Sequence, residues 1–542
     1  MAKGINLPNI PEEEQTPLIK SLLGIVEQLA EKVQLQEEEI QQLKDEISVL
    51  KGEKKRPTFK PSKMDQEAGK DKDEKDEGKA AGKDGGKRSG SEKKHKTPQL
   101  KIHDEKVCKP SEPIPAGSRF KGYRNFVVQD LVIRAHNTRY RLERWETPDG
   151  ETLAGRLPES LEGRHFGPEL MSYVLYQHHH CQVTQPLLLE QLREWGIDIS
   201  SGTINDLLLR DKARFHREKD ELLLAGLSNS NYVTVDDTGA RHQGKNGYVT
   251  HIGNEFFAWF KSTESKSRIN FLELLRAHHS DYLINDEALI YMQQQRLPKQ
   301  PLERLRDHCL QGFPDPASWE AHLDRLKINK ARHRRIATEG TLLGSILHHG
   351  FSPTLAIVSD DAGQFNILLH ALCWVHAERL VHKLIPLNDQ HREDIARVRG
   401  QIWSLYADLK TYKIQPTMAH KEELQARFDT IFTQKTRFET LNRMLKRIYR
   451  NKSELLLVLD HPDIPLHTNG SEGDIRDYVK KKKVSGGTRS DLGRQCRDTF
   501  ASLKKTCRKL GISFWDYLFD RVSGSNNIPL LPEIVCQRLA DP

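Results

Sequence analysis

Residues 231–237 read NYVTVDD, and residues 354–361 read TLAIVSDD. Each stretch is an apolar run rich in β-branched residues that closes on two acids, a pattern typical of a buried strand. Between them, GYVTHIGNEFFAWFKST (247–263) predicts two more strands with a turn at Gly253-Asn254. These segments predict an α/β domain built around a sheet with acidic strand ends.

Two helices are expected after the second strand. AGQFNILLHALCWVHAERLVHKL (362–384) should follow it directly as one helix, and HTNGSEGDIRDYVKKKKVSGG (467–487) should open a helix that carries Glu472. Carboxylates are the ligands that hard cations such as Mg²⁺ or Mn²⁺ prefer. Asp236, Asp360 and Glu472 therefore form a candidate site for two metal ions about 3.5–4 Å apart, the arrangement used in phosphoryl transfer.

The acidic neighbours Asp237 and Asp361 leave the choice of ligand open. Successive side chains of a strand point to opposite faces, so only one member of each pair can face the site. The residues alone do not decide between Asp236 with Asp360 and Asp237 with Asp361.

The flanking residues resemble the insertion sequence 66 family of bacterial transposases from about residue 165 to 525. The resemblance rests on three segments: Asp236-Asp237-Thr238; Asp360 followed by Phe365-Asn366 and Cys373-Trp374-Val375-His376; and Asn469-Gly470-Ser471-Glu472 followed by Ile475-Arg476. It implies an RNase H-like catalytic domain over 226–525 with Asp236, Asp360 and Glu472 as catalytic and metal-binding residues. It also favours the first Asp of each pair.

The sequence departs from that family in three places. Asp237 stands where the family has Glu. Residues of about 280–350 look inserted between the first two acids and read as charged helices. FVVQDLVIRAH (126–136) and TRYRLERWETPDGETLAG (138–155) read as two or three short strands with a Pro-Asp-Gly turn, so we expect a small β-rich module over 106–165. The family's cysteine-rich zinc module would fall there, but Cys108 is the only cysteine, so we expect that the module has lost its metal.

The N-terminal part should consist of a coiled coil over 16–51 and a disordered charged linker over 52–105. Apolar residues occupy heptad positions a and d except at Gln36, which favours a parallel homodimer. A single amphipathic helix is the alternative. The linker has almost no apolar side chain and cannot form a core.

Residues 166–225 predict a helix-turn-helix-like DNA-binding region. PELMSYVLYQHHH and TQPLLLEQLREWG should be helices, the second stopped by Gly196, and Ser200 should cap a third. The third helix would direct Ser201, Asn205 and Arg210 at a major groove. A plain helical hairpin is the alternative.

Basic residues also follow Glu472 on the predicted helix. Arg476 and the run Lys480, Lys481, Lys482 and Lys483 are candidate contacts to DNA phosphates. A solvated helix face is the alternative. Cys373 and His376 are three residues apart, a spacing that could bind a metal, but we expect them to pack and to position DNA. We expect the histidines 178–180 to be solvated.

The bulk properties fit a DNA partner without requiring one. The net charge is +8, and the seven cysteines include no CxxC pair, which argues against disulfides and a cysteine-based zinc site. We expect no membrane span, because no run of about 18 apolar residues occurs. The sequence near the N-terminus lacks the apolar stretch that a secretory signal requires. We therefore expect a bacterial cytoplasmic protein that associates with the nucleoid.

The sequence thus predicts a DNA transposase that binds the terminal inverted repeats of its own element and target DNA. It would cut and join DNA strands with Mg²⁺ or Mn²⁺. Its expected partners besides DNA are a second copy of the chain, bound through the coiled coil, and accessory proteins of the same element. The alternative is a catalytically inactive coiled-coil and helix-turn-helix regulator. A related nuclease such as a junction resolvase would lack the coiled coil and the tether.

Overall fold

The computed structural model describes residues 101–110, 118–158, 161 and 163–540, with isolated positions between 16 and 36. Most of the expected coiled coil (16–51) and most of the linker (52–105) lie outside the described residues, so both stay predictions. Contacts divide the chain into two units, Leu35–Val132 and the remainder. No helix within the described part is long and apolar enough to cross a bilayer.

A five-stranded mixed sheet organises the larger unit. Its order is β5-β4-β3-β8-β9. The strands are β3 (Tyr232–His242), β4 (Lys245–Gly253), β5 (Ala258–Thr263), β8 (Ala356–Ser359) and β9 (Leu369–Leu372). The first three along the chain form an antiparallel meander, and β8 and β9 run parallel to β3.

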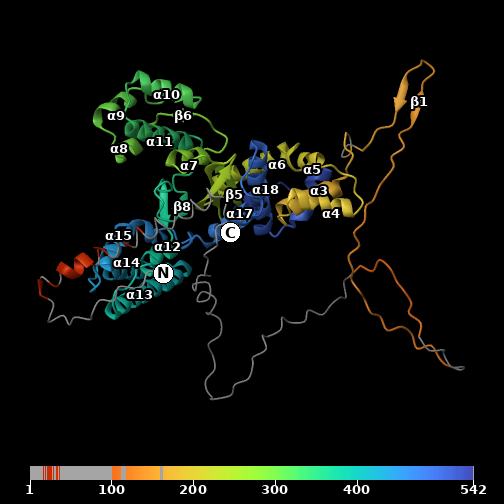
Figure 1. Cartoon of the computed structure of the whole chain (residues 1–542). Helices are drawn as coiled ribbons and strands as arrows, with labels where there is room; N and C mark the ends of the chain where they lie inside the picture. The colour runs from red at the N-terminus through yellow and green to blue at the C-terminus, as the bar shows by residue number, and fades with distance from the viewer. Residues whose placement is uncertain are drawn as a thin grey trace. The chain divides into compact units, whose positions relative to one another are not determined.

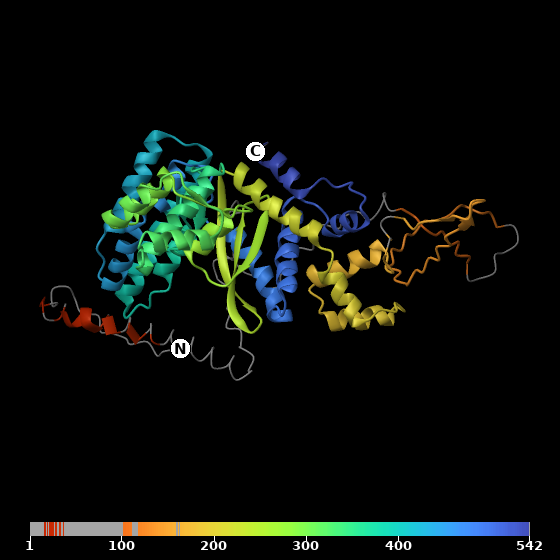
Figure 2. The same cartoon turned by 90° about the horizontal axis from the view of Figure 1, so that it is seen from above.

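Helices flank this sheet on both sides, as Figures 1 and 2 show. One group is α3 (Pro168–His179), α4 (Gln185–Glu194), α5 (Ser201–Leu209), α6 (Ala213–Asn229), α18 (Asp491–Lys509), α19 (Phe514–Ser523) and α20 (Leu531–Ala540). The other group is α7 (Arg268–Leu275) to α11 and α12 (Trp374–His382), α13 (Asp389–Ile414), α14 (Met418–Thr433), α15 (Glu439–Arg450) and α16 (Lys452–Leu455). Helix α17 (Asn469–Ser485) packs on β3 and β4.

Helix α18 seals the free edge of the sheet. Alternate backbone amides of the edge strand β5 donate to side chains one helical turn apart: Ala258 N to Thr506 Oγ1 (3.1 Å), Phe260 N to Ser502 Oγ (2.9 Å) and Ser262 N to Asp498 Oδ2 (2.7 Å). Four residues of helix rise about 6 Å and two residues of strand about 6.8 Å, so the two ladders stay in step. The contact satisfies an edge that would otherwise be open to pairing with another chain.

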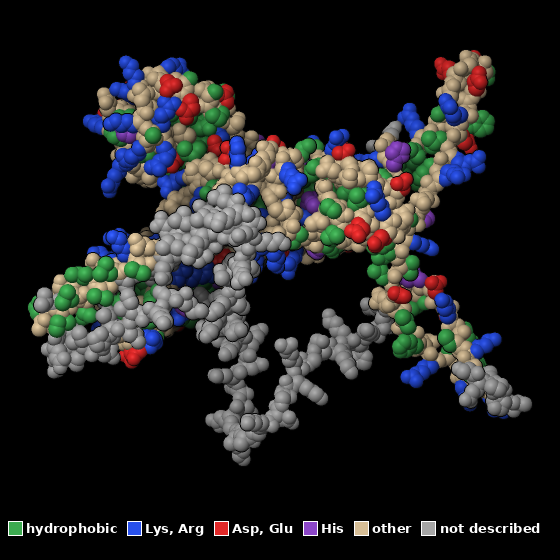
Figure 3. All heavy atoms as spheres, in the orientation of Figure 1, with side chains coloured by type: hydrophobic (Ala, Val, Ile, Leu, Met, Phe, Trp, Pro, Cys, Tyr) green, Lys and Arg blue, Asp and Glu red, His purple; other side chains and the backbone are tan. Residues whose placement is uncertain are grey.

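A mostly helical subdomain occupies the region that looks inserted in the sequence. It comprises β6 (Tyr282–Leu283), α8 (Asp286–Gln294), α9 (Lys299–Arg306), β7 (Gly312–Phe313), α10 (Pro316–Arg325) and α11 (Ala331–His348). Trp319 is fully buried in it, and its Nε1 donates to Thr338 Oγ1 (2.9 Å). Figure 3 shows Lys and Arg side chains around its outer face. The expected charged helices of about 280–350 are therefore present, and their buried apolar side chains are continuous with the core of the sheet domain.

Two expectations about the sheet are wrong in detail. Residues 362–384 are not one helix, because Leu369–Leu372 form strand β9 and the helix begins only at Trp374. A short apolar run such as LHAL fits a buried strand as well as a helix, and pairing with β8 decides it. Strand β3 also does not end at its acids but runs on to His242, paired with β4.

The region expected to be a small β-rich module has a single hairpin among its described residues. Strands β1 (Arg144–Glu146) and β2 (Thr152–Ala154) pair around the predicted Pro-Asp-Gly turn. Residues 126–136, expected to be a strand, form none. All six residues of the hairpin strands are exposed, so this hairpin has no core of its own.

Helices α3, α4 and α5 form where the sequence predicts them. Gly196 stops the second with a φ of +77°, and Ser200 Oγ accepts from Thr203 N (3.1 Å) as the N-cap of the third. Buried Ile199 fills the turn between them. The order helix, glycine turn, apolar residue, serine cap and helix is therefore confirmed as structure.

Candidate active site

Strand register brings the first two acids together. In the parallel pair, Tyr232 lies opposite Ala356 and Thr234 opposite Val358. Continuing that register by two residues brings Asp236 level with Asp360, which follows β8 directly. The parallel pairing stops there because β8 ends, while β3 continues as a hairpin arm.

The face of the sheet chooses between Asp236 and Asp237. Asp236 lies opposite His251 on β4, so the two side chains share a face. His251 Nε2 lies 3.2 Å from Asp474 Oδ2 on α17, which identifies that face as the one α17 covers. Asp236 therefore faces the helix that carries Glu472, and Asp237 faces the other way.

The second member of each acidic pair is engaged elsewhere. Asp237 accepts a hydrogen bond from Gln364 (2.7 Å) and lies 4.0 Å from the ammonium of Lys266. Asp361 forms an ion pair with Arg447 (2.6 Å). Among the described residues, neither Asp236 nor Asp360 has a basic partner within 4.0 Å.

The environment of Asp236 disfavours a lone carboxylate. Burial raises its pKa to about 7; the backbone N–H of Asp237 lowers the value, while the charges of Asp360, Asp237 and Glu472 raise it. The charges of Asp360 and Glu472 act in the same direction as burial, which fits three acids grouped at one end of the sheet. A cation between them would offset both the burial and the repulsion.

Glu472 is positioned by the residue before it. Ser471 is buried at the start of α17, and its hydroxyl donates to Thr234 Oγ1 (2.5 Å). Thr234 in turn donates to Gly253 O (2.9 Å) on the neighbouring strand. These bonds hold the first turn of α17 against β3 at Thr234, two residues before Asp236.

Glu472 has basic neighbours from α12. Its Oε1 lies 3.2 Å from Arg379 and 3.5 Å from His376 Nε2. Within the described chain, the three acids do not bring one oxygen each within 4.8 Å of one another. One ion held by all three at once is therefore not preformed, whereas two ions about 3.5–4 Å apart need no such convergence.

A chain of hydrogen bonds holds Ser359, the residue that precedes Asp360. Ser359 Oγ lies 2.8 Å from His370 Nε2, and His370 Nδ1 lies 3.0 Å from Glu454 Oε1. Asn366 also donates to Glu454 (2.7 Å). The order Ser, His and Glu is that of a hydrolytic triad, but Ser359 is completely buried. No substrate reaches it, so the chain of bonds positions the end of β8.

The Cys-Trp-Val-His segment joins the sheet to α12. Cys373 N donates to Ser359 O (2.9 Å), and the buried Trp374 indole donates to Leu455 O (2.9 Å). Burial raises the pKa of Cys373, but a hydrogen bond with His376 and its charge outweigh this and lower the pKa. The segment thus packs α12 so that His376 and Arg379 face Glu472.

A cavity of about 500 Å³ opens beside Asp360. Arg379 of α12, Lys383 at the C-terminal cap of α12 and Arg447 of α15 contribute to its lining. We refer to these three residues as the basic groove. It sets three cations next to the acids, where a polyanion would need them.

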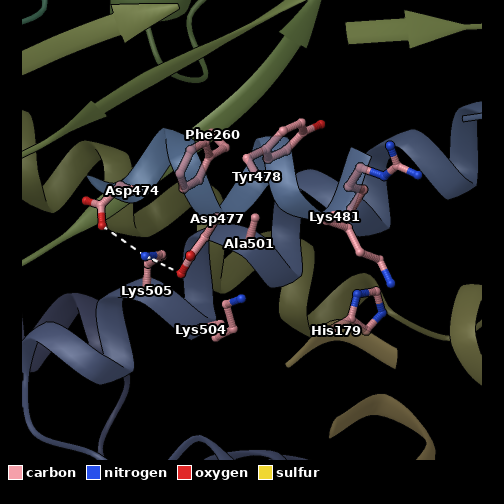
Figure 4. Close-up of a pocket in the computed structure, with 10 residues that line it drawn as sticks. His179, Phe260, Asp474, Asp477, Tyr478, Lys481, Ala501, Lys504 and Lys505 are labelled. Carbon is pink, nitrogen blue, oxygen red and sulfur yellow. Dashed lines mark ion pairs between the residues drawn. The ribbon is translucent and has the colours of Figure 1, made fainter. Parts of the chain in front are cut away.

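The other side of α17 carries acids in a neutralised setting. Asp474 Oδ2 lies 3.0 Å from Lys509, and Asp477 Oδ2 lies 2.6 Å from Lys505. Figure 4 shows Lys505 between the two carboxylates. Burial raises the pKa of Asp474, but His251 and Lys509 outweigh it and hold the pKa well below its ordinary value.

The four consecutive lysines of α17 do not share one surface. Lys481 is buried and donates to His178 O (2.5 Å), and in Figure 4 its side chain points toward His179. Burial lowers its pKa to about 7, together with the charges of Arg497 and Lys504. Consecutive helical residues point in directions about 100° apart, so a run of four always sends one inward.

The remaining basic residues of this helix differ in their surroundings. Arg476, Lys480 and Lys483 are exposed, and Lys480 lies 3.4 Å from Asp477. Lys482 donates to Gly239 O (2.5 Å). The histidines 178–180 are not all solvated as expected, since His179 stacks on Phe500 with ring centroids 4.1 Å apart.

On α5, the predicted contact residues lie at the surface to different degrees. Ser201 and Arg210 are exposed and Asn205 is half-buried. Arg210 forms an ion pair with Asp206 (2.9 Å), four residues earlier. Sequence reasoning did not find Lys266, Gln364, Arg379 or Arg447. These residues are identified only because they lie close to the acids in the folded chain. The one sequence signal is at Arg379, which follows His376 by one helical turn.

Comparison with known proteins gives two matches. A sequence profile described as Transposase IS66 family matches residues 330–496, a span that includes Asp360 and Glu472. The chain is also 45% identical over 303 residues to a Sinorhizobium fredii (strain NBRC 101917 / NGR234) protein described as "Uncharacterized protein y4jO". The aligned segment covers 56% of this chain and 94% of that protein. The profile match covers the part of the chain that holds the second acid pair and Glu472.

Proposed function

The chain belongs to the IS66 family of transposases, and from this premise we propose that Asp236, Asp360 and Glu472 are the metal-binding and catalytic residues of a DNA-cutting and DNA-joining site. The sheet order β5-β4-β3-β8-β9, with an antiparallel meander and two parallel strands, supports an RNase H-like core. The substrates would be the terminal inverted repeats of the protein's own element and its target DNA.

The observation that carries the proposal is the contrast within each acidic pair. Asp237 and Asp361 are held by Gln364, Lys266 and Arg447, whereas Asp236 and Asp360 have no basic partner among the described residues. Asp236 and Asp360 are half-buried and, within the described chain, accept only backbone hydrogen bonds, from Asp237 N and Ala362 N. Carboxylates taken partly out of water without a basic partner are costly, and a divalent cation would offset that cost. An all-oxygen donor set fits Mg²⁺ or Mn²⁺.

A bound divalent ion would make water or a 3′-hydroxyl a better nucleophile and neutralise charge on the reacting phosphate. The protein's own residues would do the positioning. Ser471 fixes Glu472 beside β3, and the chain from Ser359 to Glu454 holds Asp360. The basic groove of Arg379, Lys383 and Arg447 would hold the DNA backbone next to the acids.

DNA recognition would use surfaces away from the acids. Ser201 and Asn205 on α5, and Arg210 directly after its last residue, remain the proposed groove-reading residues. Arg476, Lys480 and Lys483 remain the proposed phosphate contacts. We leave Lys481 and Lys482 out of this set, because one is buried and the other is bonded to Gly239. A homodimer through residues 16–51 and accessory proteins of the same element complete the proposal.

The test uses purified full-length protein, DNA from the ends of the element, and Mg²⁺. Glu472→Gln keeps the shape of the side chain and removes its charge. We expect it to reduce strand cleavage by about 10³-fold or more, because transition-state charge is no longer stabilised through that ligand. DNA affinity should change by less than about threefold, since less than one phosphate contact is altered.

Asp477→Asn is the matched control. It removes a charge from the same helix, on the neutralised side, and should leave cleavage within about threefold. If the Glu472→Gln protein cut and joined element ends as well as its parent, the assignment would be wrong. A parent protein that binds element ends but never cuts them would instead favour an inactive regulator.

A further inference from the structure

The α8–α11 subdomain is joined to the sheet domain by two chain segments. One follows α7 and leads into β6, and the other follows α11 and leads to β8. His279 and Asp281 lie on the first segment, and His349 caps the end of α11 on the second. Side chains from both connections therefore meet at the neck of the subdomain.

The three side chains lie within ligand distance of one another. His349 Nε2 lies 2.8 Å from Asp281 Oδ1, and the rings of His279 and His349 stack with centroids 3.4 Å apart. One nitrogen or oxygen from each lies within 4.8 Å of the other two. In the described part of the chain, this is the one group of three His, Cys, Asp or Glu residues that meets that spacing.

Two further imidazoles border the group. The ring of His278 lies 4.0 Å from that of His279, and the ring of His348 lies 5.4 Å from that of His349. Four imidazoles in one place repel one another when protonated, and no acid other than Asp281 is within ion-pair distance of them among the described residues. A bound cation would give their lone pairs a common partner.

We propose that His279, Asp281 and His349 bind one transition-metal ion of the Zn²⁺ class at the neck of the subdomain. Two imidazole nitrogens and one carboxylate oxygen suit Zn²⁺, Co²⁺ or Ni²⁺, whereas Mg²⁺ prefers oxygen ligands alone. Three protein ligands leave a fourth position for water. Because the lone pairs of parallel rings do not converge, one ring turns about its Cβ–Cγ bond when the ion binds.

The ion would tie the start of the subdomain to its end. Because the ion would bind the folded arrangement and not the unfolded chain, its binding free energy would add to the stability of the folded arrangement. The inference does not rest on the proposed catalytic site. The oxygen-ligand site of Asp236, Asp360 and Glu472 is a separate place with a different preferred ion.

Metal binding to the full chain tests the proposal. All proteins carry Glu472→Gln to weaken the other site, are stripped with a chelator, and are titrated with Zn²⁺ by calorimetry and with Co²⁺ by visible absorption. The parent should bind one Zn²⁺ per chain. His279→Ala with His349→Ala should weaken that binding by about 100-fold or more, since loss even of a residue that supports a ligand costs 10- to 100-fold.

His278→Ala with His348→Ala is the matched control and should keep the affinity within about fivefold. His349→Ala alone serves if the double variant does not fold, because that side chain is 25% exposed. Parent protein that binds no Zn²⁺ at micromolar concentration would overturn the proposal. So would equal affinity in the parent and the His279→Ala, His349→Ala protein, or equal losses in that protein and the control.

Discussion

Helix α17 carries acids on two sides, and the protein treats them in opposite ways. Toward α18, Asp474 and Asp477 are held by Lys505 and Lys509. Toward β3 and β8, Glu472 approaches Asp236 and Asp360, which have no basic partner in the described structure. The first arrangement holds a helix on a sheet. In the second, Glu472 contacts Arg379 and His376, but the two aspartates have no such partner among the described residues, which lowers stability without a cation and prepares a place for one.

The largest stability effect should come from the neutralised side. Asp474→Ala leaves the largely buried His251 and Lys505 with fewer partners. We expect the free energy of unfolding to fall by about 3 to 5 kcal/mol, the usual cost of removing one member of a buried pair. Urea unfolding followed by circular dichroism measures it. A loss under 1 kcal/mol would mean that this side contributes little to the fold.

The same aspartate predicts an acid limit. Its pKa in the folded protein lies below the ordinary 3.8. The stability it contributes is therefore present above pH 3.8 and is lost as the pH falls below that value. Between pH 6 and pH 3, the parent should lose more stability than Asp474→Asn, as thermal unfolding at each pH would show.

The next effect concerns the sealed edge of the sheet. Asp498 accepts hydrogen bonds from Ser262 N (2.7 Å) and Tyr478 Oη (2.8 Å). Asp498→Ala leaves these buried donors unsatisfied and should lower the free energy of unfolding by about 2 to 3 kcal/mol. Hydrogen exchange at β5 should rise in this variant. Unchanged exchange there would show that α18 does not protect the edge.

A smaller effect of opposite sign should come from the uncompensated side. The pKa of Asp236 is raised from 3.8 to about 7, so its charged form lowers stability above that pH. Asp236→Asn should therefore raise the free energy of unfolding at pH 8 without metal by about 1 to 2 kcal/mol, less than the full shift gives because solvent screens this partly exposed group, and should change nothing near pH 3.8. Millimolar Mg²⁺ should stabilise the parent but not the variant. Destabilisation at pH 8 would contradict the account.

The smallest effect concerns Arg379, which competes with a cation for Glu472. The pair is partly exposed, with Arg379 34% accessible. An ion pair of this kind contributes under about 1 kcal/mol, so Arg379→Gln should tighten Mg²⁺ binding by about 2- to 5-fold. Calorimetric titration checks it, with Lys383→Gln as the control that touches no acid. Weaker Mg²⁺ binding in Arg379→Gln would give Arg379 a supporting role instead.

Much of this contrast could be predicted from the sequence. The β-branched runs before Asp236 and Asp360 identify strands, and the segment from Asn469 to Arg476 identifies the helix that carries Glu472. Local patterns suffice there because each motif specifies its own element. The choice within the acidic pairs needs the register of β3 against β8, and register depends on pairing between distant segments.

Other features lie beyond local pattern. Strand β9 resembles a helix until it pairs with β8, and Lys481 turns inward only because α17 packs against α3 and α18. The basic partners Lys266 and Arg447 come from elements far away along the chain. Contacts set by tertiary packing leave no periodic signal in the sequence, so they become visible only in the folded structure.

Paired substitutions at the two acid pairs test the central claim most directly. Asp236→Asn and Asp237→Asn, and likewise Asp360→Asn and Asp361→Asn, are compared for Mg²⁺-dependent cleavage of element-end DNA by full-length protein. We predict losses of about 10³-fold or more for Asp236→Asn and Asp360→Asn, and losses below about 30-fold for their neighbours. Cleavage that survives in Asp236→Asn but disappears in Asp237→Asn would contradict the account.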